Sequence, residues 1–117
     1  MLMLPPAVKI FLCAEATDMR RSFDKLAELT RSVLAQDPFS GHLFVFFNRP
    51  RDRVKILCWD RSGFCLYYKR LERGAFCVPK LDGGGAQLEA AELTLILEGL
   101  ELAGAKRRPR FEFRSKV

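Results

Sequence analysis

Residues 43–71 read LFVFFNRPRDRVKILCWDRSGFCLYYKRL, and this stretch decides the fold expected from the sequence. Its first segment, 43–47, is entirely apolar and predicts a β-strand that is buried on both faces. The polar segment 48–53 contains a proline and predicts a loop. Two further runs, 54–59 and 64–71, are rich in aromatic and other apolar residues and predict a second and a third strand.

A tight turn is expected between the second and the third of these strands. Residues 60–63 read DRSG, and the glycine in this turn can adopt the left-handed conformation that closes a short β-hairpin. With that turn, Cys58 lies near Cys65 and Trp59 lies near Phe64 on the paired strands. The two pairs are expected to form a cross-strand apolar cluster.

The residues before this stretch predict one more strand and a helix. Residues 8–13 have the composition of a short strand. Apolar residues then recur at helical spacing and predict a helix from about residue 18 to about residue 36. Thr17 or Asp18 is expected to be its N-cap, because either side chain can accept a hydrogen bond from the first free backbone amides.

Length and composition fit one domain. The chain has 117 residues, of which 49% are hydrophobic, which is enough for a single core and too much for a disordered chain. After a break at the glycines 83–85, residues 88–102 predict a second helix that can cover the sheet. The expected fold class is therefore α+β. We expect a small antiparallel sheet, built as a hairpin or meander and covered by two helices, in residues 1–105, and a basic C-terminal tail in residues 106–117.

Basic residues are concentrated in two parts of the chain. Twenty Lys and Arg stand against 14 Asp and Glu, so the net charge is +6. Residues 49–73 carry eight bases and three acids, and residues 106–117 carry six bases and one acid. Aromatic residues are interleaved with the first block, and this combination favours nucleic acid as a partner. A solvated hairpin with a buried aromatic face would give the same pattern.

Long basic side chains on the hairpin are the expected contacts to DNA phosphates, because they can follow the backbone without reading the bases. The predicted DNA-binding residues of the hairpin are Lys55, Arg61, Lys69, Arg70 and Arg73. Arg20 and Arg21 are added as further candidates. Two bases in the first turn of the expected helix oppose the helix dipole, so either a phosphate contact or a solvated cluster of ion pairs explains them.

The sequence predicts a cytoplasmic protein without a cofactor or a metal site. Its N-terminal residues lack the features of a signal peptide, and no apolar stretch approaches the roughly 20 residues that cross a bilayer. The cysteines lack the CxxC spacing of zinc sites and lie in apolar stretches. Reduced, unpaired core thiols are therefore expected at Cys13, Cys58, Cys65 and Cys77.

Few residues suit a catalytic role. A metal-dependent strand-transfer site needs about three converging carboxylates. Asp18 is instead expected to cap a helix, Asp60 to start a turn, and Glu72 to pair with a neighbouring arginine. Ser40 and His42 are expected to serve a turn rather than to form a catalytic pair. The prediction is that the protein has no catalytic residues and is not an enzyme.

Three segments, in this order, resemble a known family. They are TDMRRSFDKL from Thr17, DPFSGHLFVFFNRPRDRVKIL from Asp37 and WDRSGFCLYYKRLERGAF from Trp59. Together they resemble the TnpB-type accessory protein, the second open reading frame, of the bacterial insertion-sequence class sixty-six. The resemblance implies a role in moving the insertion sequence, beside a separate transposase and another small accessory protein.

The charge pattern and this resemblance together lead to one functional expectation. We expect a noncatalytic accessory protein of insertion-sequence transposition that binds DNA, the transposase, or both, and helps to assemble the transposition complex. Its expected partners are the DNA ends of the insertion sequence, the transposase and the other accessory protein, with no membrane. Two alternatives stay open: a protein-only adaptor for the transposase, whose charges tune solubility or orientation, and a cryptic metal-dependent nuclease.

Overall fold

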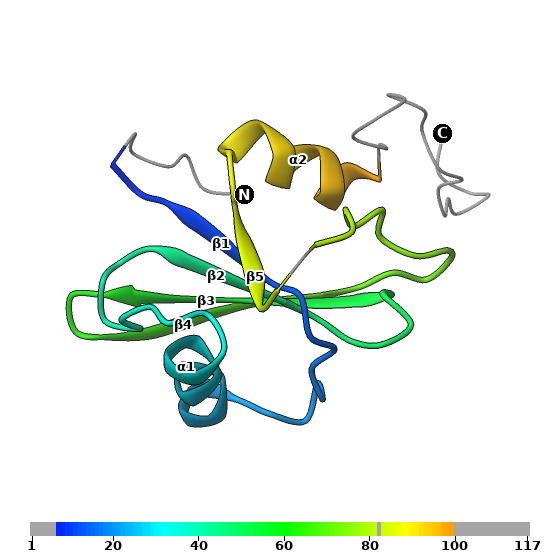
Figure 1. The fold of residues 1–117 in the computed structure, drawn as a ribbon. Coiled ribbons are helices and arrows are strands. Elements are labelled where there is room, and N and C mark those ends of the chain that lie inside the picture. Colours follow the sequence, from blue (N-terminus) through cyan, green and yellow to red (C-terminus); the bar gives the residue numbers. More distant parts are fainter. Residues whose placement is uncertain (1–6, 82, 100–117) are drawn as a thin grey trace, which may run out of the picture.

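The computed structural model describes residues 7–81 and 83–99 and shows a five-stranded sheet with one helix on each face (Figure 1). In chain order the elements are β1 (Ile10–Cys13), α1 (Phe23–Ser32), β2 (Leu43–Phe47), β3 (Arg53–Asp60), β4 (Gly63–Arg70), β5 (Gly85–Leu88) and α2 (Ala90–Glu98). The α+β class expected from the sequence is confirmed.

The sheet is mixed rather than antiparallel. Its strand order is β4-β3-β2-β1-β5, and β1 runs parallel to β2 while the other neighbouring pairs run antiparallel. Parallel neighbours need a crossover connection, and α1 supplies it between β1 and β2. The expectation of an antiparallel sheet is therefore wrong at β1, where a strand, a helix and a strand follow one another in the sequence as they do in a parallel unit.

The strands from β2 to β4 lie where the sequence predicts them. β2 covers residues 43–47, all of them buried, and the ends of β3 and β4 differ from the predicted ends by one residue. Cys58 pairs with Cys65 and Trp59 pairs with Phe64, which confirms the predicted register. In the β3–β4 turn the left-handed residue is Arg61, with a φ of 46°, rather than the expected glycine.

β5 is a strand that the sequence did not reveal, because the glycines at 83–85 indicated a break. Gly85 pairs with Cys13 of β1. A Cβ atom on Gly85 would collide with the carbonyl oxygen of Leu12 and with a methyl group of Leu34. The glycine at this position therefore allows a close approach between two backbones, which is a different role from that of a flexible loop residue.

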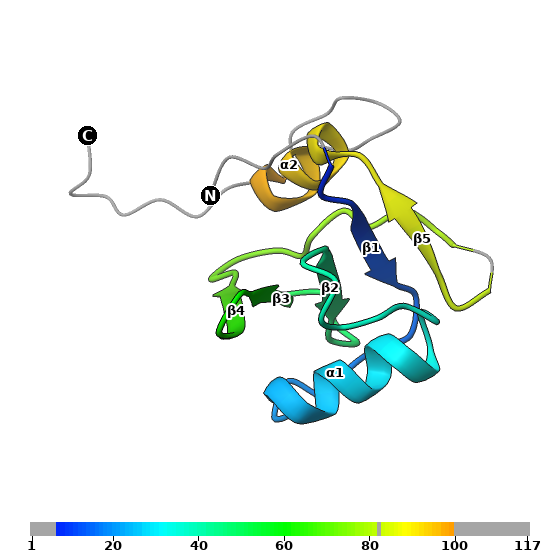
Figure 2. The same ribbon diagram turned by 90° about the vertical axis from the view of Figure 1, so that its left-hand side faces the viewer.

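Two apolar cores lie on opposite faces of the sheet, one under each helix (Figure 2). On one face Ile96 of α2 belongs to the same cluster as Val45 of β2. On the other face Leu26 of α1 packs with Phe44 and Phe46 of the same strand. Since side chains alternate along a strand, the apolar run of β2 supplies both cores, and this strand forms the centre of the molecule.

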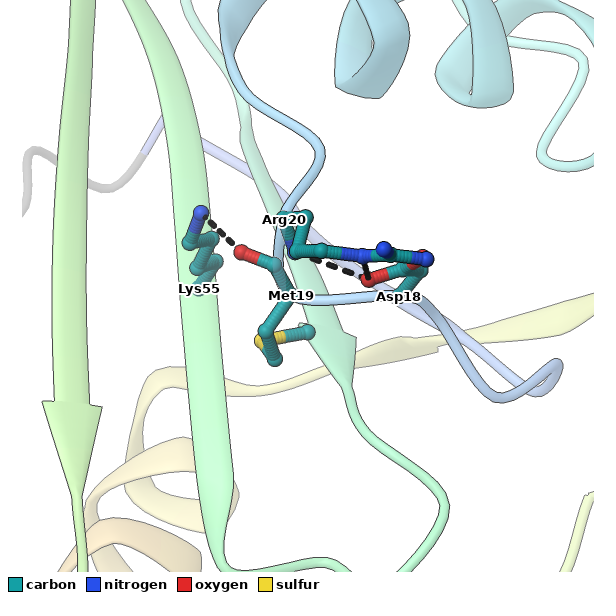
Figure 3. Close-up of polar contacts among 4 residues, drawn as sticks. All are labelled: Asp18, Met19, Arg20 and Lys55. Atoms are coloured by element: carbon teal, nitrogen blue, oxygen red, sulfur yellow. Dashed lines mark hydrogen bonds and ion pairs between the residues drawn. The ribbon is translucent and has the colours of Figure 1, made fainter.

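A buried lysine determines the path of the chain before α1. Lys55 is only 6% exposed, and its Nζ donates hydrogen bonds to the carbonyl oxygens of Met19 (2.7 Å) and Arg21 (2.8 Å). Figure 3 shows the first of these bonds. Carbonyl groups that point at Lys55 cannot accept the bonds from residue i+4 that form an α-helix. Residues 18–21 therefore form a turn, and the predicted helix starts later.

The observed α1 is shorter than the predicted helix at both ends. Its N-cap is Ser22, so the expected caps Thr17 and Asp18 are wrong. Asp18 instead accepts a hydrogen bond from the backbone N–H of Arg20 (2.9 Å) within the turn. The helix ends at Ser32 rather than near residue 36.

α2 occupies the middle of the predicted second helix. Glu89 and Glu92 form a capping box at its start, and Gly99, with a φ of 83°, ends it. Neither α2 nor any other described helix is long and apolar enough to cross a membrane. Residues 100–102 of the predicted helix, and the predicted basic tail of residues 106–117, lie outside the described residues.

All four cysteines are free thiols, but their burial differs. Cys13 is buried, Cys58 and Cys77 are half-buried, and Cys65 is exposed. The expectation of a core thiol is wrong for Cys65 because β4 is an edge strand of the sheet. Burial raises the pKa of the Cys13 and Cys58 thiols, which keeps both protonated at neutral pH.

The substitution Lys55→Met is expected to lower the free energy of unfolding by about 1–3 kcal/mol, because it removes the donor of two part-buried hydrogen bonds, which contribute about 0.5–1.5 kcal/mol each. Urea unfolding measures the change. The control is Lys25→Met at an exposed position of α1, which is expected to change stability by less than about 0.5 kcal/mol. Equal losses in the two variants would contradict a structural role for the buried ammonium group.

The substitution Gly85→Ala is expected to destabilise the protein by about 1–3 kcal/mol, because its methyl group would force β5 away from β1. Gly63→Ala is the matched control, since a Cβ at Gly63 meets nothing within 4 Å. Thermal unfolding of the two variants provides the comparison. If Gly85→Ala melts at the temperature of the parent protein, the close approach of the two strands is not required for stability.

Candidate nucleic-acid interface

Two of the predicted DNA-binding residues, Lys55 and Lys69, donate hydrogen bonds to backbone carbonyl groups of the protein itself. The ammonium group of Lys55 binds two backbone carbonyls and lies 4.7 Å from the ring centroid of Tyr68. Lys69 points to the opposite face of the sheet, where its Nζ donates to the carbonyl oxygen of Leu97 near the end of α2 (3.3 Å). Because Lys55 is buried, we assign it a structural role and no longer include it among the DNA contacts.

Two other predicted contacts lie in exposed ion pairs. Arg20 donates to both carboxylate oxygens of Asp18, with a shortest distance of 2.7 Å. Figure 3 shows the two side chains next to each other. Arg70 donates to Glu72 through Nε (3.1 Å) and Nη2 (2.9 Å). The predicted pairing of Glu72 with a neighbouring arginine is confirmed. Such exposed pairs contribute little stability, so another anion can replace the carboxylate at low cost.

The remaining predicted residues, Arg61, Arg73 and Arg21, are exposed and form no ion pair with any described residue. Arg61 lies in the turn at one end of the β3–β4 hairpin, whereas Arg73 follows the other end. Arg21 precedes α1. The structure therefore does not gather the predicted set on one surface.

A cleft of about 570 Å³ lies where β1 and β2 end. Its lining includes residues 15–19, which follow β1, and three arginines: Arg21 before α1, Arg49 in the β2–β3 loop and Arg53 at the start of β3. We call this hollow the arginine cleft. Of the three arginines only Arg21 was among the predicted contacts. The alternating bases of RPRDR at residues 49–53 were the available signal for the other two, but the sequence does not show that this loop meets residue 21.

Hydrogen bonds within the β2–β3 loop hold the backbone that carries these arginines. Asn48 donates from Nδ2 to Asp52 (2.6 Å), and its Oδ1 accepts the backbone N–H of Arg53 (3.0 Å). Arg51 has a positive φ of 64°, and its carbonyl oxygen accepts the N–H of Phe76 (2.7 Å). The loop is thus tied to itself and to the chain after β4.

The carboxylates at the arginine cleft are Glu15 and Asp18. Side-chain hydrogen bonds from Arg20, followed by its backbone N–H, lower the pKa of Asp18 to about 2. Asp18 is therefore ionised at neutral pH, and its charge is already balanced by Arg20. In the part of the chain that the structure describes, Arg21, Arg49 and Arg53 form no ion pair.

Several exposed aromatic rings lie on the α1 side of the sheet, which is also the side of Arg53, whereas the exposed Tyr67 pairs with Ile56 and lies on the α2 side. Tyr68 is 48% exposed, and its hydroxyl accepts a hydrogen bond from Arg53 Nη1 (3.2 Å). Farther along the hairpin, Phe39 packs against Trp59 and Phe64 at centroid distances of 4.9 and 5.3 Å. Flat rings beside positive charge suit nucleic-acid bases, and they also suit protein partners.

The residues weighed for catalysis make structural contacts. Asp18 and Glu72 form the ion pairs given above, and the carbonyl oxygen of Asp60 accepts the N–H of Ser62 in the β3–β4 turn. The ring Nδ1 of His42 accepts a hydrogen bond from the backbone N–H of Lys9 (2.9 Å). The backbone N–H of His42 donates to the Ser40 hydroxyl oxygen (3.3 Å). Among the described residues, no group of three or more His, Cys, Asp and Glu side chains could hold a metal ion.

Comparison with protein families places this architecture in a known group. The family of IS66 Orf2-like proteins matches residues 8–107, a range that contains all seven elements and the arginine cleft. The chain belongs to the IS66 Orf2-like family. This confirms the resemblance carried by the three sequence motifs. The IS66 Orf2-like protein is thus an accessory protein associated with an insertion sequence.

This IS66 Orf2-like protein is similar to two proteins of Sinorhizobium fredii (strain NBRC 101917 / NGR234). It is 38% identical to the uncharacterized protein y4hO over 101 residues, which are 85% of this chain and 88% of the relative. It is 34% identical to the uncharacterized protein y4jC over 102 residues, 87% of each chain. No solved structure matches it significantly.

The Asp18–Arg20 pair gives this IS66 Orf2-like protein a measurable pH dependence. An NMR titration of the side-chain carboxyl carbon is expected to give Asp18 a pKa of about 2, below the ordinary 3.8. Because the pKa of Asp18 is lower in the folded state, the pair contributes its full stabilisation at pH values above the ordinary pKa of 3.8. This stabilisation is lost as the pH falls toward 2. Arg20→Gln is expected to raise this pKa toward 3.8. If the variant keeps the low value, the side chain of Arg20 is not its cause.

Proposed function

We propose that this protein is a noncatalytic accessory factor of transposition that contacts DNA phosphates with the face that carries the arginine cleft. The observation that carries the proposal is that Arg21, Arg49 and Arg53 line one hollow and form no ion pair with any described residue. Like charges that share a site repel one another unless an anion compensates them. Phosphate oxygens match the forked donors of a guanidinium group.

Other features of the molecule support DNA as the ligand. The net charge of +6 attracts a polyanion from a distance. Arg61 and Arg73 add exposed cations on the hairpin, and Tyr68 places an exposed ring beside Arg53. Because these groups suit the phosphate backbone rather than base edges, we expect binding that depends strongly on salt and weakly on DNA sequence.

The contacts of the carboxylates support a noncatalytic role. Asp18 binds Arg20 and Glu72 binds Arg70, each through two hydrogen bonds or more. Among the described residues, neither carboxylate belongs to a group of three or more His, Cys, Asp and Glu side chains that could hold a metal ion. DNA binding without cleavage is therefore the simpler use of this surface.

We further propose that the transposase and the other accessory protein bind the same molecule, so that DNA and protein contacts together assemble the transposition complex at the ends of the insertion sequence. The protein-only adaptor is the second candidate, and the cluster of Phe39, Trp59 and Phe64 favours it. Phe39 is 48% exposed, and aromatic residues are enriched in protein interfaces. In that case the arginines set the orientation and the rate of association.

The double variant Arg21→Gln with Arg49→Gln is expected to weaken binding to a short DNA duplex. It should also lower the slope of log K against log salt by about two, because each phosphate contact contributes about 0.9. Fluorescence anisotropy titrations over a series of salt concentrations measure both quantities. The matched control is Lys9→Gln with Lys25→Gln, which removes the same charge from exposed lysines outside the cleft and should leave the slope nearly unchanged.

A second double variant, Arg61→Gln with Arg73→Gln, tests the hairpin as the site of contact. If only this variant lowers the slope, DNA binds the hairpin and not the cleft face. If the parent protein binds neither duplex nor single-stranded DNA in a salt-dependent way but still binds the transposase, the adaptor function replaces the proposed one.

A further inference from the structure

The arginine cleft occupies a special position in the topology of the sheet. β1 and β2 are parallel neighbours, and the cleft lies beyond the point where both end. After β1 the chain continues to α1 on one face of the sheet, and after β2 it continues into the loop that leads to β3. β5 pairs with the other edge of β1. The carboxyl ends of both parallel strands therefore lie at the cleft, and open α/β sheets bind ligands outside the carboxyl ends of their strands.

The charge of the arginine cleft is positive even when its carboxylates are counted. Arg21, Arg49 and Arg53 line it together with Glu15 and Asp18. Asp18 is neutralised by Arg20, which lies outside the lining. The lining therefore has one uncompensated negative charge, that of Glu15, and three positive charges, those of the guanidinium groups. A single monovalent anion would leave part of this charge uncompensated.

Contacts from three segments of the chain hold two of the three arginines, Arg21 and Arg53. Lys55 binds the carbonyl oxygen of Arg21. Asn48 binds the backbone N–H of Arg53, and the hydroxyl of Tyr68 binds the guanidinium group of the same arginine. Groups held in this way lose less conformational freedom on binding than side chains on a mobile loop. The cleft is thus a partly preorganised site for an anion.

We propose that the arginine cleft binds a phosphomonoester, either the terminal phosphate of a DNA strand or the phosphate of a free nucleotide. A phosphomonoester carries close to two negative charges at neutral pH and offers three free oxygens, whereas an internal phosphodiester carries one charge. A hollow of about 570 Å³ at the end of two strands accepts the end of a chain or a small molecule. If the ligand is the terminal phosphate of a DNA strand, the inference rests on the proposed function. If the ligand is a free nucleotide, it does not.

The test uses the full chain and two kinds of probe. One is a pair of identical oligonucleotides that carry either a 5′-phosphate or a 5′-hydroxyl group, and the other is deoxyadenosine 5′-monophosphate. The phosphorylated oligonucleotide is expected to bind about tenfold more tightly, the effect of one good charge-assisted contact. The mononucleotide is expected to shift the backbone amide NMR signals of residues 15–19 and 48–53. Shifts there show that a free nucleotide suffices, and a preference for phosphorylated DNA without such shifts identifies a DNA end as the ligand.

Two single variants localise the effect. Arg49→Gln is expected to remove the preference for the 5′-phosphate, because it takes one donor from the cleft without touching the contacts of the fold. Lys9→Gln removes the same charge from an exposed residue that does not line the cleft and is expected to preserve the preference. If both variants lose it equally, net charge rather than the cleft causes the preference, and the inference is wrong.

The remaining outcomes separate this inference from the proposed function. Equal affinity for the two oligonucleotides, with no shifts from the mononucleotide at the cleft, overturns the inference and leaves DNA binding intact. Cleft shifts from the mononucleotide without binding of either oligonucleotide support the inference and contradict DNA binding. If neither the oligonucleotides nor the mononucleotide bind, both the inference and the proposed DNA binding are wrong.

Discussion

The ammonium group of Lys55 connects parts of the molecule that are distant in sequence. It donates hydrogen bonds to the carbonyl oxygens of Met19 and Arg21 and lies beside the ring of Tyr68. A buried charge is stable only when hydrogen bonds replace the water that it loses. The chain before α1 must therefore leave helical geometry to supply them. The late start of α1 and the wall of the arginine cleft near Arg21 follow from this contact, whereas the pairing of β3 with β4 places Tyr68 beside Arg53.

Local patterns in the sequence were sufficient for the elements whose partners are close in the chain. The apolar run at 43–47 and the turn at 60–63 predicted β2, β3, β4 and the pairing of Cys58 with Cys65. The same reasoning failed where a distant contact decides the structure. The start of α1 depends on Lys55, and β5 depends on the absence of a side chain at Gly85 opposite β1. Neither dependence leaves a periodic signal in the sequence.

The sequence predicted that the candidate site is basic and binds an anion, but it did not predict which residues form the site. Charge counting identified the basic block at 49–73 and its aromatic residues, and it favoured an anionic partner. It could not show that Lys55 is buried or that Lys69 binds the end of α2, because both contacts join residues far apart in the chain. Nor could it show that Arg21 and Arg49 share a hollow, since that depends on the parallel pairing of β1 and β2.

The position of β1 also affects how the chain is made. β1 is the first of the described strands along the chain, yet one of its neighbours is β2 and the other is β5, at residues 85–88. Until the ribosome releases residues 85–88, one side of β1 has unpaired backbone groups, which can bond to other chains. A chain terminated before residue 85 would keep that edge open permanently. A chain terminated after α2 would retain the strand pairings among the described residues, so early and late truncations differ in their tendency to aggregate.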